Sequence, residues 1–297
     1  MCCCAIKVPS SRVGDFSFGN LKVLKLRGII FTIDKSLVIR LSVLKKFETK
    51  NCCWLSAHDV TIEAPLLESV LIEQDRESVF RKPRSCQIKF SASCIKEFTY
   101  RSLGGISQPI VLSNSSAARN ASVNIILYYN VSYVEETKSC AFILLKQFSE
   151  VKCIKFHASK VLTQPNVAVL PKFEMLSHLE LGFVNVEVLL GLLQKSCVLN
   201  TLLFKGISNF DQELLNSAVV PDCLTSTLQV VKFENVYGSD HELFLAKYFM
   251  ENGMVLERMS FSLANAELSK SKVIEEFKEK LYSSKKGLSF AILEFYY

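Results

Sequence analysis

The sequence lacks several patterns that would assign it to a common functional class. No apolar run reaches the roughly 18 consecutive residues of a membrane-spanning helix. The N-terminal segment MCCCAIKVPSSRVGD contains no apolar stretch of the kind found in a secretory signal. These two absences predict a protein that does not contact a membrane, and we expect it in the cytoplasm or the nucleus.

The 11 cysteines lack the spacing of a metal site. Cys2, Cys3 and Cys4 are contiguous, Cys52 and Cys53 are adjacent, and no C-x-x-C pair occurs. Structural zinc sites use cysteine and histidine pairs at short, fixed spacings. An odd number of cysteines without a secretory signal indicates reduced thiols. Because the spacing of a metal site is missing, we expect neither a metal site nor a cofactor.

Enzyme motifs are also missing. The sequence has no H-E-x-x-H, G-x-S-x-G, Walker or G-x-G-x-x-G motif. Cys153 could meet His157 and His178 after folding, but a nucleophile also needs an orienting third group and an oxyanion site. We therefore expect no catalytic residues and a protein that is not an enzyme.

What the sequence does contain is a repeated apolar pattern. Segments matching L-x-x-L-x-L, with any apolar residue at the fixed places, recur every 23 to 34 residues. They begin at Leu21, Leu44, Leu67, Ile95, Val123, Val151, Leu176, Leu199, Leu228, Leu256 and Phe290. Such periods are typical of leucine-rich repeats. Because one repeat cannot bury its apolar side alone, neighbouring repeats are expected to stack into a parallel sheet over a shared core.

The repeats predict an α/β fold, a horseshoe-like leucine-rich-repeat solenoid. We expect a parallel sheet on its concave face and helices and irregular segments on its convex face. Helices are predicted at 186–195, at 239–253 and at 272–282, the last with Val273, Phe277 and Leu281 on one stripe. The segment 55–65 is predicted to be irregular.

The helix at 239–253 has clear end signals. Ser239 and Glu242 have the spacing of a capping box, and Gly253 is expected to end the helix in a left-handed conformation. For the whole chain we expect a disordered N-terminus at 1–17, leucine-rich repeats at 18–218 and a distinct set of C-terminal repeats at 219–297 that continues the solenoid.

The stretch 219–261 resembles the FBD segment of plant F-box/FBD/leucine-rich-repeat proteins. Beside the strand 228–233 and the closing V-L-x-x-M at 255–259, the resemblance is carried by Pro221, Cys223, Leu224, Gly238 and Glu242. Upstream, LKVLKLRGIIF, IEAPLLESVLI and FEMLSHLELGF are similar to the repeats of that family. The resemblance covers nearly the whole chain from about residue 18 onward, and it makes the C-terminal repeats FBD-like.

The resemblance implies a non-catalytic protein-binding module similar to the substrate-recognition part of an SCF-type E3 ubiquitin ligase receptor. In this family an N-terminal F-box docks on the Skp-type adaptor of a cullin complex, and the repeats select the protein to be ubiquitinated. The segment before the first repeat is too short for a three-helix F-box, so the F-box is missing from this sequence. The Skp-type adaptor and the cullin are expected partners if an F-box is supplied elsewhere.

Positive charge is concentrated near the N-terminus. The net charge is +6, and residues 1–50 hold ten Lys and Arg against three acidic residues. In the first two repeats Lys25, Arg27, Lys46 and Lys50 are predicted to face the concave side. No aromatic platform is interleaved with them, so we expect a solvated face and do not favour nucleic acid as a partner. A free-standing nucleic-acid-associated or scaffold repeat protein is the alternative function.

The middle repeats predict an apolar anchor for an unknown protein target on the concave face. If the fixed positions fill the core, the third, fifth and seventh residues of each motif are exposed. Ile125, Leu127 and Tyr129 then form one patch, and Leu71 and Leu203 occupy the same positions elsewhere. Exposed apolar residues on neighbouring strands are typical of protein interfaces. The alternatives are a different register in this repeat or a covering loop.

Overall fold

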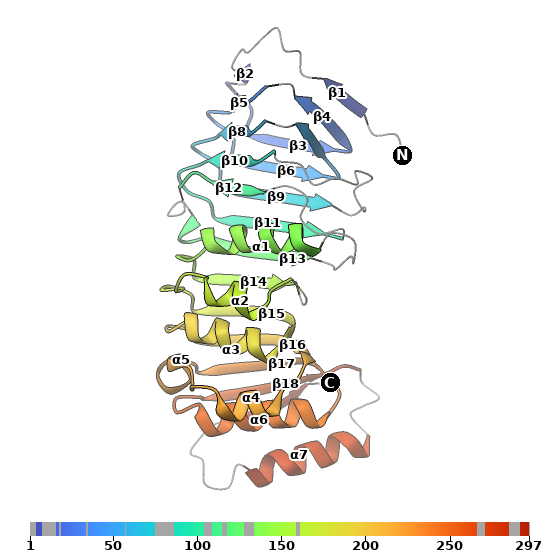
Figure 1. Cartoon of the computed structure of the whole chain (residues 1–297), viewed down its shortest axis with the longest axis vertical. Coiled ribbons are helices and arrows are strands. Elements are labelled where there is room, and N and C mark those ends of the chain that lie inside the picture. The colour runs from blue at the N-terminus through green and yellow to red at the C-terminus, as the bar shows by residue number, and fades with distance from the viewer. Residues whose placement is uncertain are drawn as a thin grey trace. The chain divides into compact units, whose positions relative to one another are not determined.

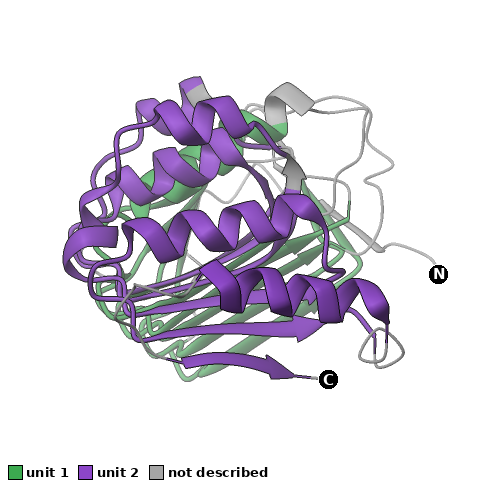
Figure 2. Ribbon diagram, turned by 90° about the horizontal axis from the view of Figure 1, so that it is seen from below, with its two compact units in different colours: residues 1–154 green, residues 155–297 purple. Residues whose placement is uncertain are grey.

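The computed structural model describes residues 4–7, 16–17, 19–33, 35–56, 58–74, 86–103, 109–114, 118–127, 134–158, 161–265, 271–284 and 292–296 (Figure 1). The chain forms two compact units, residues 1–154 and 155–297, coloured separately in Figure 2. We call them unit 1 and unit 2. Their boundary falls inside strand β14 (Cys153–His157).

Unit 1 consists mainly of strands, and every described strand pair in it is parallel. The strands of the repeats form one sheet, in chain order β3 (Val23–Arg27), β6 (Lys46–Lys50), β9 (Ser69–Gln74), β11 (Glu97–Ser102) and β13 (Ser122–Leu127). A second sheet contains β2 (Phe16–Ser17), β5 (Leu37–Arg40), β8 (Val60–Glu63), β10 (Ile88–Ser91) and β12 (Ile110–Leu112). A third contains β1 (Cys4–Lys7), β4 (Ile29–Ile33) and β7 (Cys53–Ser56).

The second and third sheets correct two expectations from the sequence. The segment 55–65 is not irregular, because it contributes to β7 and forms β8. Val60 and Ile62 are buried and alternate with half-exposed Thr61 and Glu63, a strand pattern that parallel pairing with β5 and β10 reinforces. Strands β1 and β2 lie within the segment 1–17 that was expected to be disordered.

A glutamine side chain completes the second sheet beside β12. Helix α1 (Val134–Gln147) contacts this strand, and its last residue reaches the strand's backbone. The side-chain Nε2 of Gln147 donates to the carbonyl oxygen of Ile110 at 2.9 Å, and its Oε1 accepts from the backbone N–H of Leu112. The Gln147 amide therefore satisfies two backbone groups that a neighbouring strand would otherwise pair.

Unit 2 alternates strands with helices. Its parallel sheet has the order β15 (His178–Asn185), β16 (Thr201–Asn209), β17 (Val230–Val236), β18 (Arg258–Leu263) and β19 (Ile292–Tyr296). Its helices are α2 (Gln164–Ala168), α3 (Val186–Lys195), α4 (Gln212–Ser217), α5 (Asp222–Ser226), α6 (Asp240–Asn252) and α7 (Lys272–Ser284). Within this unit the helices that the structure describes lie on one side of the sheet, and none of them lies on the other face, which we call the uncovered face (Figure 2).

Local signals in the sequence predict three of the unit 2 helices, α3, α6 and α7. Helix α3 has the predicted bounds, and its many apolar residues are buried. The capping box of α6 is confirmed: the Glu242 N–H donates to Ser239 Oγ at 3.3 Å, and the Ser239 N–H donates to Glu242 Oε2 at 2.8 Å. In α7 the buried stripe contains Ile274 with Phe277 and Leu281, while Val273 is 53% exposed, which corrects the predicted stripe.

Gly253 ends α6 for a different reason from the one expected. Its φ is −83°, so it is not left-handed. A Cβ at this position would lie 2.5 Å from the carbonyl oxygen of Phe249 and 3.0 Å from Cβ of Leu256. Glycine is therefore required here because the backbone of the preceding turn comes too close for any side chain.

A column of phenylalanine rings forms the core under the last four strands of unit 2. Phe204, Phe233, Phe261 and Phe295 occupy equivalent places in β16 to β19. Their successive ring centroids are 4.5, 4.8 and 5.0 Å apart. Phe277 of α7 packs against Phe261 at 5.6 Å, which joins the column to the helices. Because side chains alternate along a strand, this column directs the intervening residues to the uncovered face.

We expect Gln147→Met to lower the free energy of unfolding by about 1–3 kcal/mol, because the backbone groups of Ile110 and Leu112 lose their partner. Urea denaturation monitored by circular dichroism measures the change. Lys146→Met, at the exposed neighbouring position, is the matched control and is expected to stay within about 0.5 kcal/mol of wild type. Equal stability of both variants would contradict the role given to Gln147.

Gly253→Ala is expected to destabilise the protein by about 1–3 kcal/mol, because the added methyl group would lie 2.5 Å from the carbonyl oxygen of Phe249. Thermal unfolding compares it with Met254→Ala, whose side chain is 75% exposed at the next position and which should be nearly neutral. A Gly253→Ala variant that melts at the wild-type temperature would show that the turn adapts.

Candidate functional site

The uncovered face of the unit 2 sheet presents one row of residues across five strands. The register places these residues side by side in the order Glu180, Leu203, Lys232, Ser260 and Glu294. Leu203 is half-buried and Lys232 is exposed. The row lies opposite the phenylalanine column, so its positions follow from the packing of the core.

Glu180 is the centre of a charged cluster at one end of this row. Its carboxylate accepts from Lys155 Nζ at 2.7 Å and lies 3.0 Å from Nε2 of His157. The Glu180 side chain is only 12% exposed. His178, on the same strand and the same side, is half-buried. The partial burial of these groups makes their charge states depend on each other.

Burial determines the protonation of the two histidines. It lowers the pKa of His157, which the charge of Lys205 lowers further and Glu180 raises in part. Burial likewise lowers the pKa of His178. For Glu180, burial alone would raise the pKa, but the hydrogen bond and charge of Lys155, together with His157, hold it below its usual value. At neutral pH the cluster therefore consists of an ionised carboxylate, an ammonium group and two neutral imidazoles.

Two more carboxylates on these strands are held by cations. Glu234 lies 4.0 Å from Nζ of Lys205, and Glu294 lies 3.8 Å from Nη1 of Arg258. The Glu294 carboxylate also accepts a hydrogen bond from the hydroxyl of Tyr296 at 2.7 Å. Each of the three carboxylates Glu180, Glu234 and Glu294 therefore has a cation beside it.

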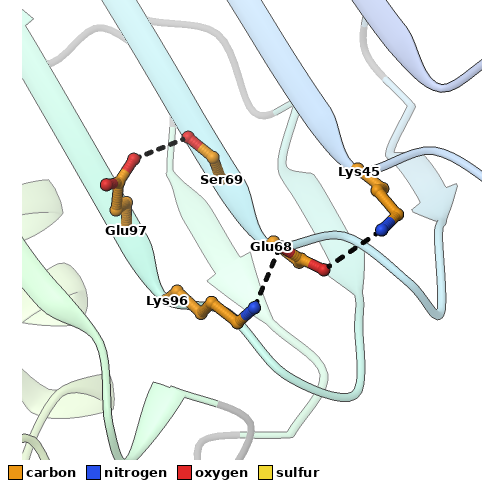
Figure 3. Close-up of polar contacts among 5 residues, drawn as sticks. All are labelled: Lys45, Glu68, Ser69, Lys96 and Glu97. Atoms are coloured by element: carbon orange, nitrogen blue, oxygen red, sulfur yellow. Dashed lines mark hydrogen bonds and ion pairs between the residues drawn. The ribbon is translucent and has the colours of Figure 1, made fainter.

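Unit 1 also has ion pairs between neighbouring strands, at the start of its repeat strands (Figure 3). Glu68 lies between two lysines, 3.7 Å from Nζ of Lys45 and 3.0 Å from Nζ of Lys96. Beside it, Ser69 Oγ donates to the Glu97 carboxylate at 3.3 Å. The hydrogen bond and charge of Lys96 lower the pKa of Glu68. These exposed pairs arrange the surface but add little to stability.

Acidic partners reduce the basic character expected for the N-terminal repeats. Lys25 Nζ lies 2.7 Å from the carboxylate of Glu48, and Lys50 Nζ lies 3.2 Å from that of Glu73. Arg27 and Lys46 are exposed at the same sheet. The four basic residues do lie on neighbouring strands β3 and β6, but two of them are neutralised across the sheet.

The structure contradicts the exposed apolar patch predicted in the middle repeats. Ile125 is fully buried and Leu127 is 5% exposed. Tyr129 lies outside the described residues. The register pairs Phe98 with Val123 and Tyr100 with Ile125. Phe98 and Tyr100 occupy the fixed fourth and sixth places of their motif, so Val123 and Ile125 occupy these places in the next repeat. The motif of this repeat therefore starts an odd number of residues away from the predicted start. An odd shift moves every side chain to the opposite face of a strand, so these residues fill the core. Leu71 and Leu203 are half-buried.

The FBD motif residues stabilise the connections between elements. Cys223 and Leu224 are fully buried in α5, and Cys223 Sγ donates to the carbonyl oxygen of Leu193 in α3 at 3.5 Å. Burial raises the pKa of the Cys223 thiol to about 12, so it remains protonated. Pro221 occupies the position immediately before α5, and Gly238 has a φ of +79° in the turn before α6. Glu242 belongs to the capping box, so all five FBD motif residues take part in forming helices or turns.

The helix side of unit 2 contains a small cavity. It measures about 270 Å³ and lies between α2, α3 and α4, lined by apolar residues such as Val167, Leu190 and Leu214. Pockets for drug-sized ligands are usually larger. In the described part of the chain, no group of three His, Cys, Asp or Glu is arranged to hold a metal ion, and no helix is long and apolar enough to cross a membrane.

Comparisons with known proteins bear on the FBD segment and on the repeats. Residues 216–261 match the family model described as FBD. The F-box/FBD/LRR-repeat protein At5g53840 of Arabidopsis thaliana is 37% identical over 83 residues, which is 27% of this chain and 19% of that protein. The F-box/FBD/LRR-repeat protein At3g14710 of the same plant is 25% identical over 260 residues, 83% of this chain and 55% of that protein.

These matches confirm the resemblance to plant F-box/FBD/LRR-repeat proteins. A third relative, the FBD-associated F-box protein At5g27750 of Arabidopsis thaliana, is 34% identical over 101 residues, 32% of this chain and 22% of that protein. In each case the chain covers about half or less of the relative's length. No solved structure gives a significant match.

The lowered histidine pKa values predict that acid destabilises unit 2. Below pH about 6.5 the unfolded chain binds protons at His157 and His178 before the folded chain does, so the free energy of unfolding falls. Below about 4.5 the stabilising contribution of ionised Glu180 is lost as well. Urea denaturation from pH 7.5 to 5 should show a shallower decline for a His157→Gln, His178→Gln double variant. A decline as steep as that of wild type would contradict the assignment.

Proposed function

We propose that this chain is a non-catalytic, protein-binding leucine-rich-repeat solenoid that acts as the substrate-recognition part of an SCF-type ubiquitin ligase receptor. One observation carries the proposal. The unit 2 sheet, which contains strands of the FBD-matching residues 216–261, has helices on one face and leaves charged and half-buried apolar side chains on the other. Such a surface suits recognition of another protein better than chemistry on a small molecule.

The repeat architecture supports the solenoid part of the proposal. In both units the repeat strands are parallel, and each pairs with the strand of the next repeat. Stacked repeats of this kind create extended sheet faces for partners. On the sheet of unit 1, the proposed contact residues are Lys25, Arg27, Lys46, Lys50 and Leu71. On that of unit 2, Leu203 takes this role.

The names of the relatives support the connection with a ubiquitin ligase. Two of them are F-box/FBD/LRR-repeat proteins and one is an FBD-associated F-box protein. We propose that the repeats described here select the target, and that the Skp-type adaptor and the cullin are reached through an F-box supplied elsewhere. The ion pairs of Lys25 and Lys50 give no support to the alternative of a nucleic-acid-binding protein.

The sheet face of unit 2 can be tested with a matched pair of variants. The full chain is immobilised, and proteins captured from plant extract are quantified for wild type, Leu203→Asp and Val273→Asp. Leu203→Asp is expected to reduce capture of the main wild-type partners at least about tenfold, because a charge replaces an apolar contact. Val273 is equally apolar and 53% exposed on helix α7, so its variant should bind like wild type.

Two results would contradict the proposal. If wild type, Leu203→Asp and Val273→Asp capture the same amounts, and circular dichroism shows each variant folded, the sheet face is not the binding surface. Turnover of a substrate by the purified chain would contradict the non-catalytic role. Ubiquitination of a captured partner, reconstituted with purified adaptor and cullin complex and an F-box fused to the chain, would test the ligase connection directly.

A further inference from the structure

The charges on the unit 2 sheet face do not all have partners within the face. On the solvent-facing side of the strands, each of the three glutamates, Glu180, Glu234 and Glu294, lies within 4.0 Å of a cation. Lys232, an exposed residue in the middle of β17, has no ion-pair partner among the residues that the structure describes. The uncompensated charge of this face is therefore positive, and it is located at one central residue.

The two neighbours of Lys232 in the row give this charge a specific setting. On one side, Leu203 of β16 is in register with Lys232, and neighbouring strands lie about 4.8 Å apart. On the other side, Ser260 of β18 is in register with it and is itself buried. An apolar contact surface and a cation are thus adjacent, on strands whose positions the phenylalanine column maintains.

We infer that this surface binds a segment of a partner protein in which an acidic side chain and an apolar side chain are close neighbours. The carboxylate pairs with Lys232, and the apolar side chain packs on Leu203. This inference rests on the proposed function, and it specifies the chemistry of the partner. Lys232 lies in the FBD-matching segment, which gives that segment a contact residue in addition to its structural motif residues.

Charge complementarity favours an acidic segment over the other partners. A basic segment would have to compete with Lys155, Lys205 or Arg258 for a carboxylate that is already paired, and it would meet the unpaired Lys232. A nucleic acid binds through many phosphate contacts. The strands of this face offer it one cation without a partner among the described residues.

The experiment starts from a displayed library of random 12-residue peptides selected on the full wild-type chain. Enriched peptides are expected to contain Asp or Glu within two positions of Leu, Ile, Val, Met or Phe. Synthetic versions are then measured by fluorescence anisotropy. Lys232→Glu should weaken their binding at least tenfold, and exchanging the peptide's acidic residue for Lys should restore binding to Lys232→Glu. Lys247→Glu, on helix α6, is the control and should bind like wild type.

The possible outcomes separate this inference from the proposed function. If peptides are enriched and lose binding in Leu203→Asp but not in Lys232→Glu, the sheet face binds peptides and the acidic partner is wrong. If no enriched peptide depends on either residue, both the inference and the proposed binding face are overturned. Restoration by the charge exchange supports a direct contact, because a merely misfolded variant would not regain binding.

Discussion

Burial of every second side chain under a parallel sheet is the constraint on which the surface of unit 2 depends. Phe204, Phe233, Phe261 and Phe295 occupy one inward place in four successive strands, with ring centroids 4.5 to 5.0 Å apart. Once these rings are stacked, the residues preceding them must point to the other side. Moving one strand by one residue would expose a phenylalanine and bury a charged or polar residue, so the core also sets the order of residues on the outer face.

The ion pairs on that outer face differ in length and in burial. Glu180 is shared between Lys155 and His157 in a partly buried position, whereas Glu234 and Glu294 form longer pairs with Lys205 and Arg258. The same use of cross-strand pairs appears in unit 1, where Glu68 lies between Lys45 and Lys96 (Figure 3). Repeated strands bring equivalent positions together, so opposite charges at one motif position become neighbours. We propose that a partner recognises the charge that these internal pairs leave uncompensated.

The FBD segment illustrates how a recognisable motif relates to a binding surface. The residues that make the segment recognisable are occupied in the fold: Cys223 and Leu224 bury α5 against its neighbours, Gly238 forms a turn and Glu242 caps α6. The residues of the segment that can contact a partner, such as Lys232, stand between the motif positions.

The sequence by itself determined the features that depend on neighbours in the chain. The apolar repeat indicated parallel strands, the run at 186–195 gave the bounds of α3, and Ser239 with Glu242 formed the expected cap, because periodicity and capping are local. Only the tertiary structure decided that unit 1 has a second and a third sheet in addition to the sheet of its repeat strands. It also decided that Ile125 and Leu127 face the core, and that the Gln147 side chain pairs with the backbone of an edge strand. Register and sheet pairing join residues more than 20 positions apart, and apolar residues at every second position fit either face until a neighbouring strand selects one.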